Sequence, residues 1–233
     1  MKKFLKVLGF LFVFGILVLI VFAWSANEEL SEGTTGPQAE ELAHKMLKAL
    51  NEEAYQNTRF LEWSYRGGAN QYVWDKRNGF VTVKWDEVRV ELNLNDPKSS
   101  KAYTEKAPVQ SSKKQKLIDK ALKNFNNDSF WLVAPYKVFD TGTERSLVTL
   151  KDGNAGLLVT YHSGGTTPGD SYLWILNENG FPVAYKMWVD IIPIGGLEAS
   201  WDEWLVTKSG AYLPKSHKLG PVNLSMGDVK GYN

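Results

Sequence analysis

The chain has 233 residues with 27 basic and 26 acidic side chains, a net charge of +1, and no cysteine. This charge balance disfavours a nucleic-acid-binding protein, which normally has a basic excess. The lack of cysteine excludes disulfides, thiolate metal ligands, cysteine nucleophiles and a lipid-modified N-terminal cysteine. With 43% hydrophobic and 23% charged residues, the chain is expected to have a folded core. Once an N-terminal segment is set aside, about 200 residues remain, which suits one domain, with two small domains as the alternative.

The N-terminus is strongly apolar. An uncharged run from Val7 to Trp24 follows three lysines and precedes three glutamates. As a helix this run is about 27 Å long, which nearly matches a hydrocarbon core of roughly 30 Å. Because positive residues stay on the cytoplasmic side, the sequence predicts a transmembrane anchor within residues 1–26 and a domain that faces the periplasm.

A cleaved signal peptide is the second interpretation of residues 1–26, although the apolar region of such a peptide is usually only about 7–15 residues long. Ala23 and Ser25 offer weak cleavage sites. Both interpretations place the folded domain in a bacterial cell envelope, either tethered to the inner membrane or secreted after cleavage. The membrane is therefore the predicted partner of the N-terminal segment.

A polar linker is predicted at residues 27–36. Two amphipathic helices are predicted further along the chain, at residues 37–56 and 111–126, because apolar side chains recur there at helical spacing. Pro37 suits the first helical position of the first helix. The apolar face of the second helix begins at Leu117, and lysines form its opposite face. We expect both helices to pack one face against the rest of the domain.

Strand patterns fill the remaining chain. Residues 88–94 alternate between apolar and polar side chains, which is typical of a half-buried antiparallel strand. Turn signals such as Asn78-Gly79 separate the strands. The loop at residues 163–170, "SGGTTPGD", is interpreted as one more connection of this kind. It lacks the Gly-Lys-Ser/Thr ending of a phosphate-binding loop, and no helix is predicted after it.

Together these elements predict an α+β fold for residues 37–233, with a strongly curved antiparallel sheet, a half-open barrel, wrapped on the two helices. The order of helix, strands, helix and strands over residues 37–217 resembles the periplasmic lipoprotein carriers and the outer-membrane lipoprotein receptors. That resemblance implies a curved sheet whose hollow holds acyl chains. The C-terminal stretches "GDSYLWILNENGFPVAYKMWV" and "IIPIGGLEASWDEW" resemble, more specifically, a group of exported bacterial proteins without an established activity.

No recognised catalytic or metal-binding motif occurs in the sequence. The three histidines have no known metal-ligand spacing, and adjacent acidic pairs fall on strands, where neighbouring residues point to opposite faces. We therefore predict that the protein is not an enzyme and that it has no catalytic residue, no metal and no cofactor. A hydrolase with an unrecognised site is retained as an alternative, with His162 and Asp170 as the first residues to inspect.

Aromatic residues are frequent, with 9 Trp, 10 Tyr and 11 Phe. On strands they either fill the core or line an apolar cavity on the concave face of the sheet. The segment 191–196, "IIPIGG", is too apolar for a solvated connection, so it plugs the core, forms a mobile lip at the cavity or touches a membrane. Pro193 and the two glycines prevent a regular strand from continuing through it.

The predicted function is a membrane-tethered or secreted binding module for a hydrophobic ligand such as a lipid or an acyl chain. Its predicted ligand-binding residues are Trp85, Trp174, Tyr185, Trp201, Ile192 and Ile194. A carbohydrate-binding aromatic β-sandwich is the alternative, in which the same aromatic side chains would be exposed on a flat or grooved face. No nucleic acid is expected as a partner.

Overall fold

The structure is a computed structural model that describes Phe10, Phe14, Ser25 and residues 27–105, 107–110, 112–164 and 167–233. The predicted anchor or signal peptide, residues 1–26, lies outside the described residues except for Phe10, Phe14 and Ser25. Within the described part of the chain, no helix is both long and apolar enough to span a bilayer.

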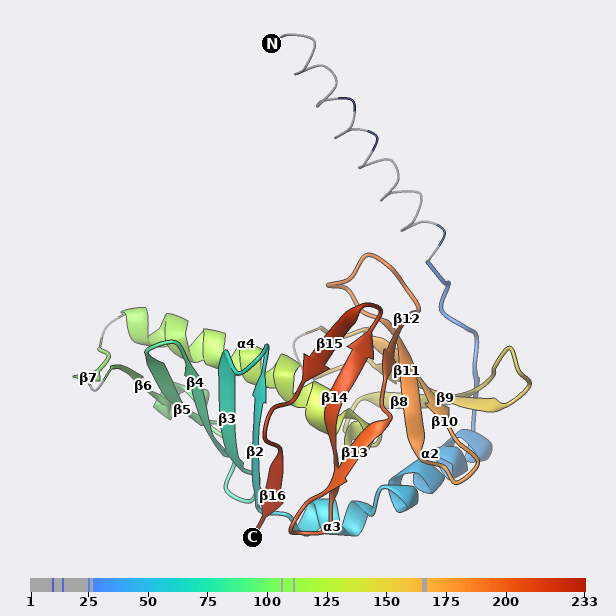
Figure 1. The fold of residues 1–233 in the computed structure, drawn as a ribbon, viewed down its shortest axis with the longest axis horizontal. Coiled ribbons are helices and arrows are strands. Elements are labelled where there is room, and N and C mark those ends of the chain that lie inside the picture. The colour runs from blue at the N-terminus through green and yellow to red at the C-terminus, as the bar shows by residue number, and fades with distance from the viewer. Residues whose placement is uncertain are drawn as a thin grey trace.

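The described residues form three sheets and three α-helices, and all pairs of neighbouring strands are antiparallel (Figure 1). This confirms the predicted α+β class. One continuous curved sheet was predicted, whereas the strands divide into three sheets, and none of these sheets closes into a barrel. The six-stranded sheet ends at Trp201, whose ring is fully buried while its backbone N–H donates to the Val183 carbonyl at 2.7 Å. The three strands within residues 203–225 then pair with one another and not with the preceding sheet, whereas the last strand, Lys230–Tyr232, pairs with Phe60–Tyr65.

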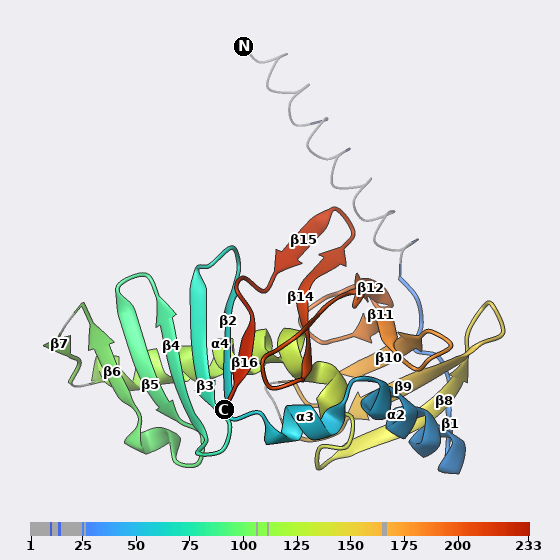
Figure 2. The same cartoon turned by 60° about the horizontal axis from the view of Figure 1, so that its bottom comes forward.

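A seven-stranded sheet lies at one end of the molecule (Figure 2). Its strands are, in spatial order, β16 (Lys230–Tyr232), β2 (Phe60–Tyr65), β3 (Asn70–Asp75), β4 (Phe80–Trp85), β5 (Val88–Asn93), β6 (Lys101–Thr104) and β7 (Ala107–Pro108). The predicted β3–β4 hairpin is present, but only Gly79 in its turn has a positive φ, so the turn is not the two-residue type I′ form. Strand β5 buries Val90 and Leu92 as predicted.

The other two sheets complete the domain. The six-stranded sheet has the order β1 (Thr34–Thr35), β8 (Thr143–Thr149), β9 (Ala155–Tyr161), β10 (Ser171–Leu176), β11 (Pro182–Trp188) and β12 (Leu197–Ser200). The three-stranded sheet consists of β13 (Glu203–Val206), β14 (Tyr212–Leu219) and β15 (Val222–Ser225), and it lies between the two larger sheets (Figures 1 and 2). The loop at residues 163–170 joins β9 to β10, as predicted.

The helices differ from the predicted ones at their ends. The predicted helix at residues 37–56 is divided into α2 (Pro37–Ala49) and α3 (Glu52–Asn57), because Asn51 between them adopts a left-handed conformation with φ 55° and ψ 59°. The second helix, α4 (Ser112–Val133), continues well beyond the predicted end at residue 126. Asn, Asp and Ser are weak helix formers, but here the Asp128 side chain is hydrogen-bonded to the neighbouring sheet, so tertiary contacts outweigh local propensity.

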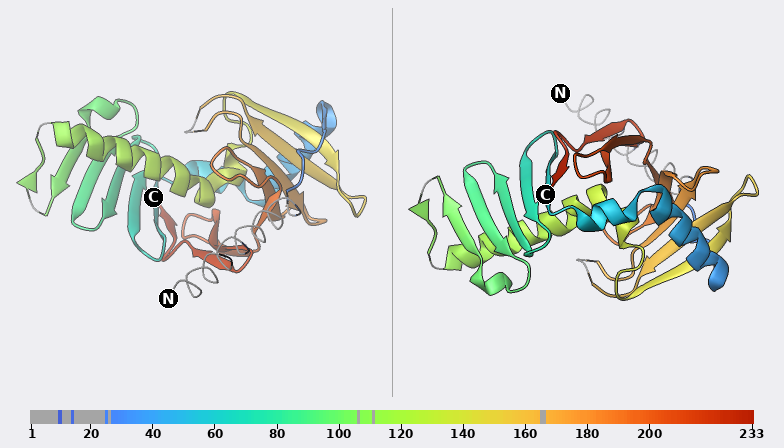
Figure 3. Two further views of the ribbon diagram at one scale, coloured as in Figure 1. Left: turned by 90° about the horizontal axis from the view of Figure 1, so that it is seen from above. Right: turned by 90° about the horizontal axis from the view of Figure 1, so that it is seen from below.

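One hydrophobic core connects all three sheets. Helix α4 contacts β5 and β6 at one end and β14 at the other, so it crosses from the seven-stranded sheet toward the rest of the molecule (Figure 3). Helix α2 covers the inner face of β8 and β9. A short 3-10 helix, η2 (Ala134–Lys137), follows α4, and its Tyr136 stacks on Tyr55 of α3 with ring centroids 3.9 Å apart. The sheets are therefore parts of one folded unit.

The outer face of the six-stranded sheet is also partly covered. Val148, Leu158 and Leu173 form a small second cluster there, on the side opposite to the main core. The predicted linker is attached to this sheet: Thr34 and Thr35 pair with β8 as the edge strand β1, and Glu28 lies against the outer face, where it contacts Lys186 and Trp188. The segment between the N-terminal run and α2 is thus bound to the sheet.

Candidate functional site

Three of the six predicted ligand-binding residues meet in the interior. Trp174 lies on β10, Tyr185 on β11 and Trp201 directly after β12, and all three side chains are fully buried. The ring centroids are 5.1 Å apart for Trp174 and Tyr185, 5.0 Å for Trp174 and Trp201, and 5.5 Å for Tyr185 and Trp201. Residues 174 and 185 are direct cross-strand partners, so the antiparallel register itself brings them together.

These rings belong to a larger set that we call the aromatic cluster. Helix α4 contributes two of its members and strand β14 contributes a histidine, and each member has a ring contact with at least one other. The cluster consists of Phe130, Trp131, Tyr161, Tyr172, Trp174, Tyr185, Trp201 and His217. Aromatic pairs at these distances contribute about 0.5–1.5 kcal/mol each beyond their burial, so the cluster is a major source of stability.

The aromatic cluster contains four buried polar atoms without a hydrogen-bond partner among the described residues. They are the hydroxyls of Tyr161 and Tyr185 and the indole Nε1 atoms of Trp174 and Trp201. Burial raises the pKa of both tyrosines well above 10, so both hydroxyls keep their protons. Buried polar groups in native proteins are nearly always paired, and each exception calls for a specific explanation. All four atoms can donate a hydrogen bond, whereas only the two hydroxyl oxygens can also accept one; the Trp201 indole lies close enough to the Tyr185 hydroxyl to oppose the rise of its pKa.

His217 faces two acceptors. Its Nδ1 lies 2.8 Å from the Ser200 carbonyl oxygen and its Nε2 lies 2.7 Å from the Trp131 carbonyl oxygen. A neutral imidazole has only one N–H, so the lone pair of its other nitrogen faces the lone pairs of a carbonyl oxygen. An imidazolium would instead donate a hydrogen bond to both carbonyl oxygens. Burial lowers the pKa of His217 below its usual 6.5, while the two carbonyls and the charge of Asp202 oppose this shift.

The stability of the domain is expected to depend on pH through His217. The unfolded chain protonates this imidazole near pH 6.5, whereas the folded chain does so only at lower pH. Between the two values the unfolded state binds more protons, so the free energy of unfolding falls as the pH drops below about 6.5. Urea denaturation between pH 7.5 and 5 measures this effect. His217→Gln should flatten the pH dependence, whereas the control His44→Gln, at an exposed position, should retain it; equal slopes in both variants would contradict the assignment.

The other three predicted residues lie elsewhere. Trp85 ends β4 in the seven-stranded sheet, where it is buried beneath Lys120 of α4, whose Nζ lies 4.9 Å from the ring centroid. Ile192 and Ile194 belong to the loop between β11 and β12. Ile192 is half-buried and packs against the main core, and Ile194 is also half-buried. The six predicted residues therefore do not form one site, and the aromatic cluster contains only Trp174, Tyr185 and Trp201.

A buried carboxylate was not predicted from the sequence. Asp128 on α4 accepts hydrogen bonds from Asn70 Nδ2 at 2.7 Å and Tyr72 OH at 2.5 Å, and its other oxygen accepts from Asn127 Nδ2 at 2.8 Å. Burial, assisted by this carboxylate, raises the pKa of Tyr72 well above 10, so its hydroxyl remains a donor. Nothing in the local sequence marks this contact, because Asn70 and Asp128 are far apart in the chain.

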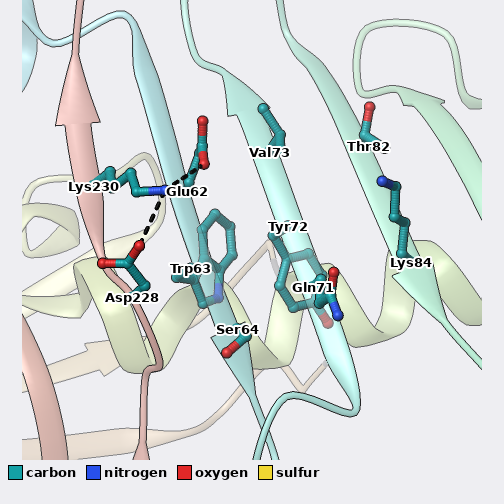
Figure 4. A pocket seen from close by; sticks show the side chains of 10 residues that line it. All are labelled: Glu62, Trp63, Ser64, Gln71, Tyr72, Val73, Thr82, Lys84, Asp228 and Lys230. Atoms are coloured by element: carbon teal, nitrogen blue, oxygen red, sulfur yellow. Dashed lines mark hydrogen bonds and ion pairs between the residues drawn. The ribbon is translucent and has the colours of Figure 1, made fainter.

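Among the surface hollows formed by the described residues, two are shallow ones that none of the four predicted aromatic residues lines. The first, of about 210 Å³, lies on the outer face of β2, β3 and β4 beside β16 (Figure 4). Lys230 there pairs with Glu62 at 3.4 Å and with Asp228 at 3.1 Å, so its charge is balanced locally. The second, of about 340 Å³, lies near Glu40, whose two carboxylate oxygens share the Nε–H of Arg145 at 2.9 and 2.8 Å.

The residues considered for hydrolysis have separate partners. His162 Nε2 lies 3.9 Å from a carboxylate oxygen of Glu144, and both side chains are more than half exposed. Asp170 is buried and accepts from the Thr167 hydroxyl at 2.5 Å and from the Asp190 backbone N–H at 3.2 Å. No group of three His, Asp or Glu side chains that could hold a metal ion occurs in the described ranges.

No protein-family model matches the chain, and no curated protein matches its sequence. The function proposed below is based on the chain's own sequence and structure, and in particular on the side chains of the aromatic cluster.

Proposed function

We propose that the protein is a binding module of the bacterial cell envelope for a hydrophobic ligand with a polar, hydrogen-bond-accepting end, such as a long-chain carboxylic acid or its ester. The proposal rests on the four unpaired donors of the aromatic cluster. Indole N–H groups donate and do not accept, so the ligand atoms that satisfy Trp174 and Trp201 are acceptors. The aromatic rings around these donors suit an apolar chain.

To bind within the aromatic cluster, the ligand has to displace some of the aromatic side chains from their packed positions. In the described conformation the cluster members contact one another, with centroids about 4.4–5.8 Å apart, so a bound chain requires a second arrangement of these side chains. A ligand shifts the protein toward this second arrangement only if its affinity for the second arrangement exceeds its affinity for the packed arrangement. The unpaired donors provide that difference, because they gain hydrogen bonds only when the ligand is present.

The resemblance to lipoprotein carriers, which implies an acyl-chain ligand, agrees with this chemistry. The carbohydrate alternative requires aromatic side chains at the surface, and Trp85, Trp174, Tyr185 and Trp201 are all buried. Export to the periplasm, by an uncleaved anchor or after cleavage of a signal peptide, remains part of the proposal and rests on the sequence of residues 1–26.

Replacing Tyr185 by phenylalanine is expected to leave the ligand-free domain as stable as the wild type or up to about 1 kcal/mol more stable, because the change removes an unpaired buried hydroxyl. Tyr136→Phe is the matched control. Its hydroxyl lies 3.0 Å from the Leu50 carbonyl oxygen and 2.6 Å from that of Tyr212, so this change should cost about 1–2 kcal/mol. Thermal unfolding of the delipidated full chain measures both effects.

Binding is measured by titrating the same proteins with a dansyl-labelled fatty acid. The wild type should bind it, Tyr185→Phe should bind about tenfold more weakly through the loss of one hydrogen bond, and Tyr136→Phe should bind like the wild type. If Tyr185→Phe loses as much stability as Tyr136→Phe, a bound water already satisfies the hydroxyl and the ligand interpretation is wrong. A wild-type chain that does not bind the probe also contradicts the proposal.

A further inference from the structure

The segment after the apolar N-terminal run is bound to one particular loop. We call residues 27–35 the strap and residues 189–196 the β11–β12 loop. The Glu28 backbone N–H donates to the Gly195 carbonyl at 2.9 Å, and the Gly195 N–H donates to Asn27 Oδ1 at 2.8 Å. The Glu28 carbonyl accepts from Trp188 Nε1 at 2.8 Å. The start of the strap is thus held by two hydrogen bonds to the end of this loop and by a third to Trp188, the last residue of β11.

Charge strengthens the same attachment. The Glu28 carboxylate accepts two hydrogen bonds from Lys186 Nζ, at 2.9 and 2.7 Å, and Lys151 lies 3.5 Å away. The hydrogen bond from Lys186 lowers the pKa of Glu28, so this carboxylate is ionised at neutral pH. The strap therefore has a defined position on the outer face of the six-stranded sheet.

The two glycines of the loop are needed for this contact. A Cβ at Gly195 would lie 2.6 Å from the Glu28 carbonyl oxygen, and one at Gly196 would lie 2.6 Å from the Glu28 Cβ. Gly196 also has a φ of 76°, which other residues rarely adopt. Ile192 meanwhile packs against the main core. The loop is therefore held by the strap at its glycines and by the main core at Ile192. These two contacts disfavour the mobile lip, which was one of the three interpretations of the sequence.

The apolar run ends, in the sequence, just before the strap residues that bind this loop. Trp24 and Asn27 are three residues apart, which spans at most about 10 Å of chain. Ile191 in the loop is 68% exposed, although burial of such a side chain is favourable. Figure 1 shows the orange loop between β11 and β12 beside the blue start of the strap. An exposed isoleucine therefore lies near the point where the chain would leave a membrane.

We propose that the β11–β12 loop is a second membrane contact, in which Ile191 enters the headgroup region of the bilayer next to the N-terminal anchor. This inference rests on the proposed anchor and is independent of the proposed ligand. Asp190, Glu198 and Glu29 are exposed acidic residues around the loop, so the contact is apolar and not electrostatic. It therefore suits zwitterionic lipid and does not weaken at high salt, which screens exposed charges.

The chain has no cysteine, so a single introduced cysteine carries a unique fluorescent label. The test uses the full chain in phosphatidylcholine nanodiscs that contain a lipid with a nitroxide quencher near the headgroup. The label is placed at Ile191→Cys or, as a matched control, at Phe80→Cys on β4. Phe80 is 52% exposed, and strand β4, which begins with it, lies at the opposite end of the molecule from the strap (Figure 1).

The label at position 191 should be quenched several-fold more than the label at position 80, equally at low and high salt. Similar weak quenching at both positions, in chains that remain in the nanodisc, overturns the loop contact and leaves the anchor intact. Chains that separate from the nanodisc overturn both the anchor and the loop contact. A label at 191 that is shielded from water but not quenched by lipid indicates contact with another protein molecule and also overturns the proposal.

Discussion

Replacing Trp201 by alanine is expected to lower the free energy of unfolding by about 4 kcal/mol. The side chain is fully buried and has ring contacts with Trp174, Tyr185 and His217. Removal of a buried tryptophan costs roughly 3–5 kcal/mol, because its contacts are lost and the space is only partly refilled. For a domain of this size the melting temperature should fall by about 10 °C.

Circular dichroism during thermal unfolding measures this loss, and Phe80→Ala is the control. Phe80 is an exposed aromatic residue, so its removal should change the free energy of unfolding by no more than about 0.5 kcal/mol. Because one core connects the three sheets, Trp201→Ala should shift a single transition of the whole domain. A second transition that keeps the wild-type midpoint would show that the seven-stranded sheet unfolds independently and would contradict a shared core.

Replacing Asp128 by alanine is expected to cost about 3 kcal/mol. The change leaves the buried side chains of Asn70 and Tyr72 without their acceptor, and each unpaired buried donor costs roughly 1–3 kcal/mol. The better helix propensity of alanine returns only about 0.7 kcal/mol or less. Helix α4 would also lose the hydrogen bonds that hold its second half to β3.

The control for this change is Asp119→Ala. Asp119 is an exposed residue of the same helix and accepts one hydrogen bond from Gln115 at 2.8 Å, so its loss should cost only a few tenths of a kcal/mol. Urea denaturation of both variants measures the difference. Asp128→Asn should be intermediate, since one amide oxygen can still accept. Equal stability of Asp128→Ala and Asp119→Ala would mean that the buried network does not stabilise the fold.

The aromatic cluster shows which parts of the candidate site could be predicted from the sequence and which could not. Trp174, Tyr185 and Trp201 were predicted to bind one ligand together, and the structure places these three side chains in mutual contact in the interior. Trp85 has the same local pattern but lies on a different sheet. Periodicity reports the face of a strand and not the sheet to which the strand belongs, so it could not separate Trp85 from the others.

His217 and Asp128 were not recognised as special for a related reason. Apart from the Asn127 amide beside Asp128, their partners are backbone carbonyls and side chains more than fifteen residues away in the chain. The strap is a similar case, since a polar segment with glycine is typical of a linker, and only contacts with Gly195 and Lys186 reveal that it is bound. No local pattern carries information of this kind.

The sequence by itself determined the α+β class, the amphipathic helices, the antiparallel hairpins and the alternation of β5, because these depend on side-chain spacing within a few residues. Only the tertiary structure decided the division into three sheets, the break at Asn51, the extension of α4 to Val133 and the attachment of the strap. Each of these follows from contacts between distant parts of the chain, where burial and hydrogen bonding outweigh local propensity.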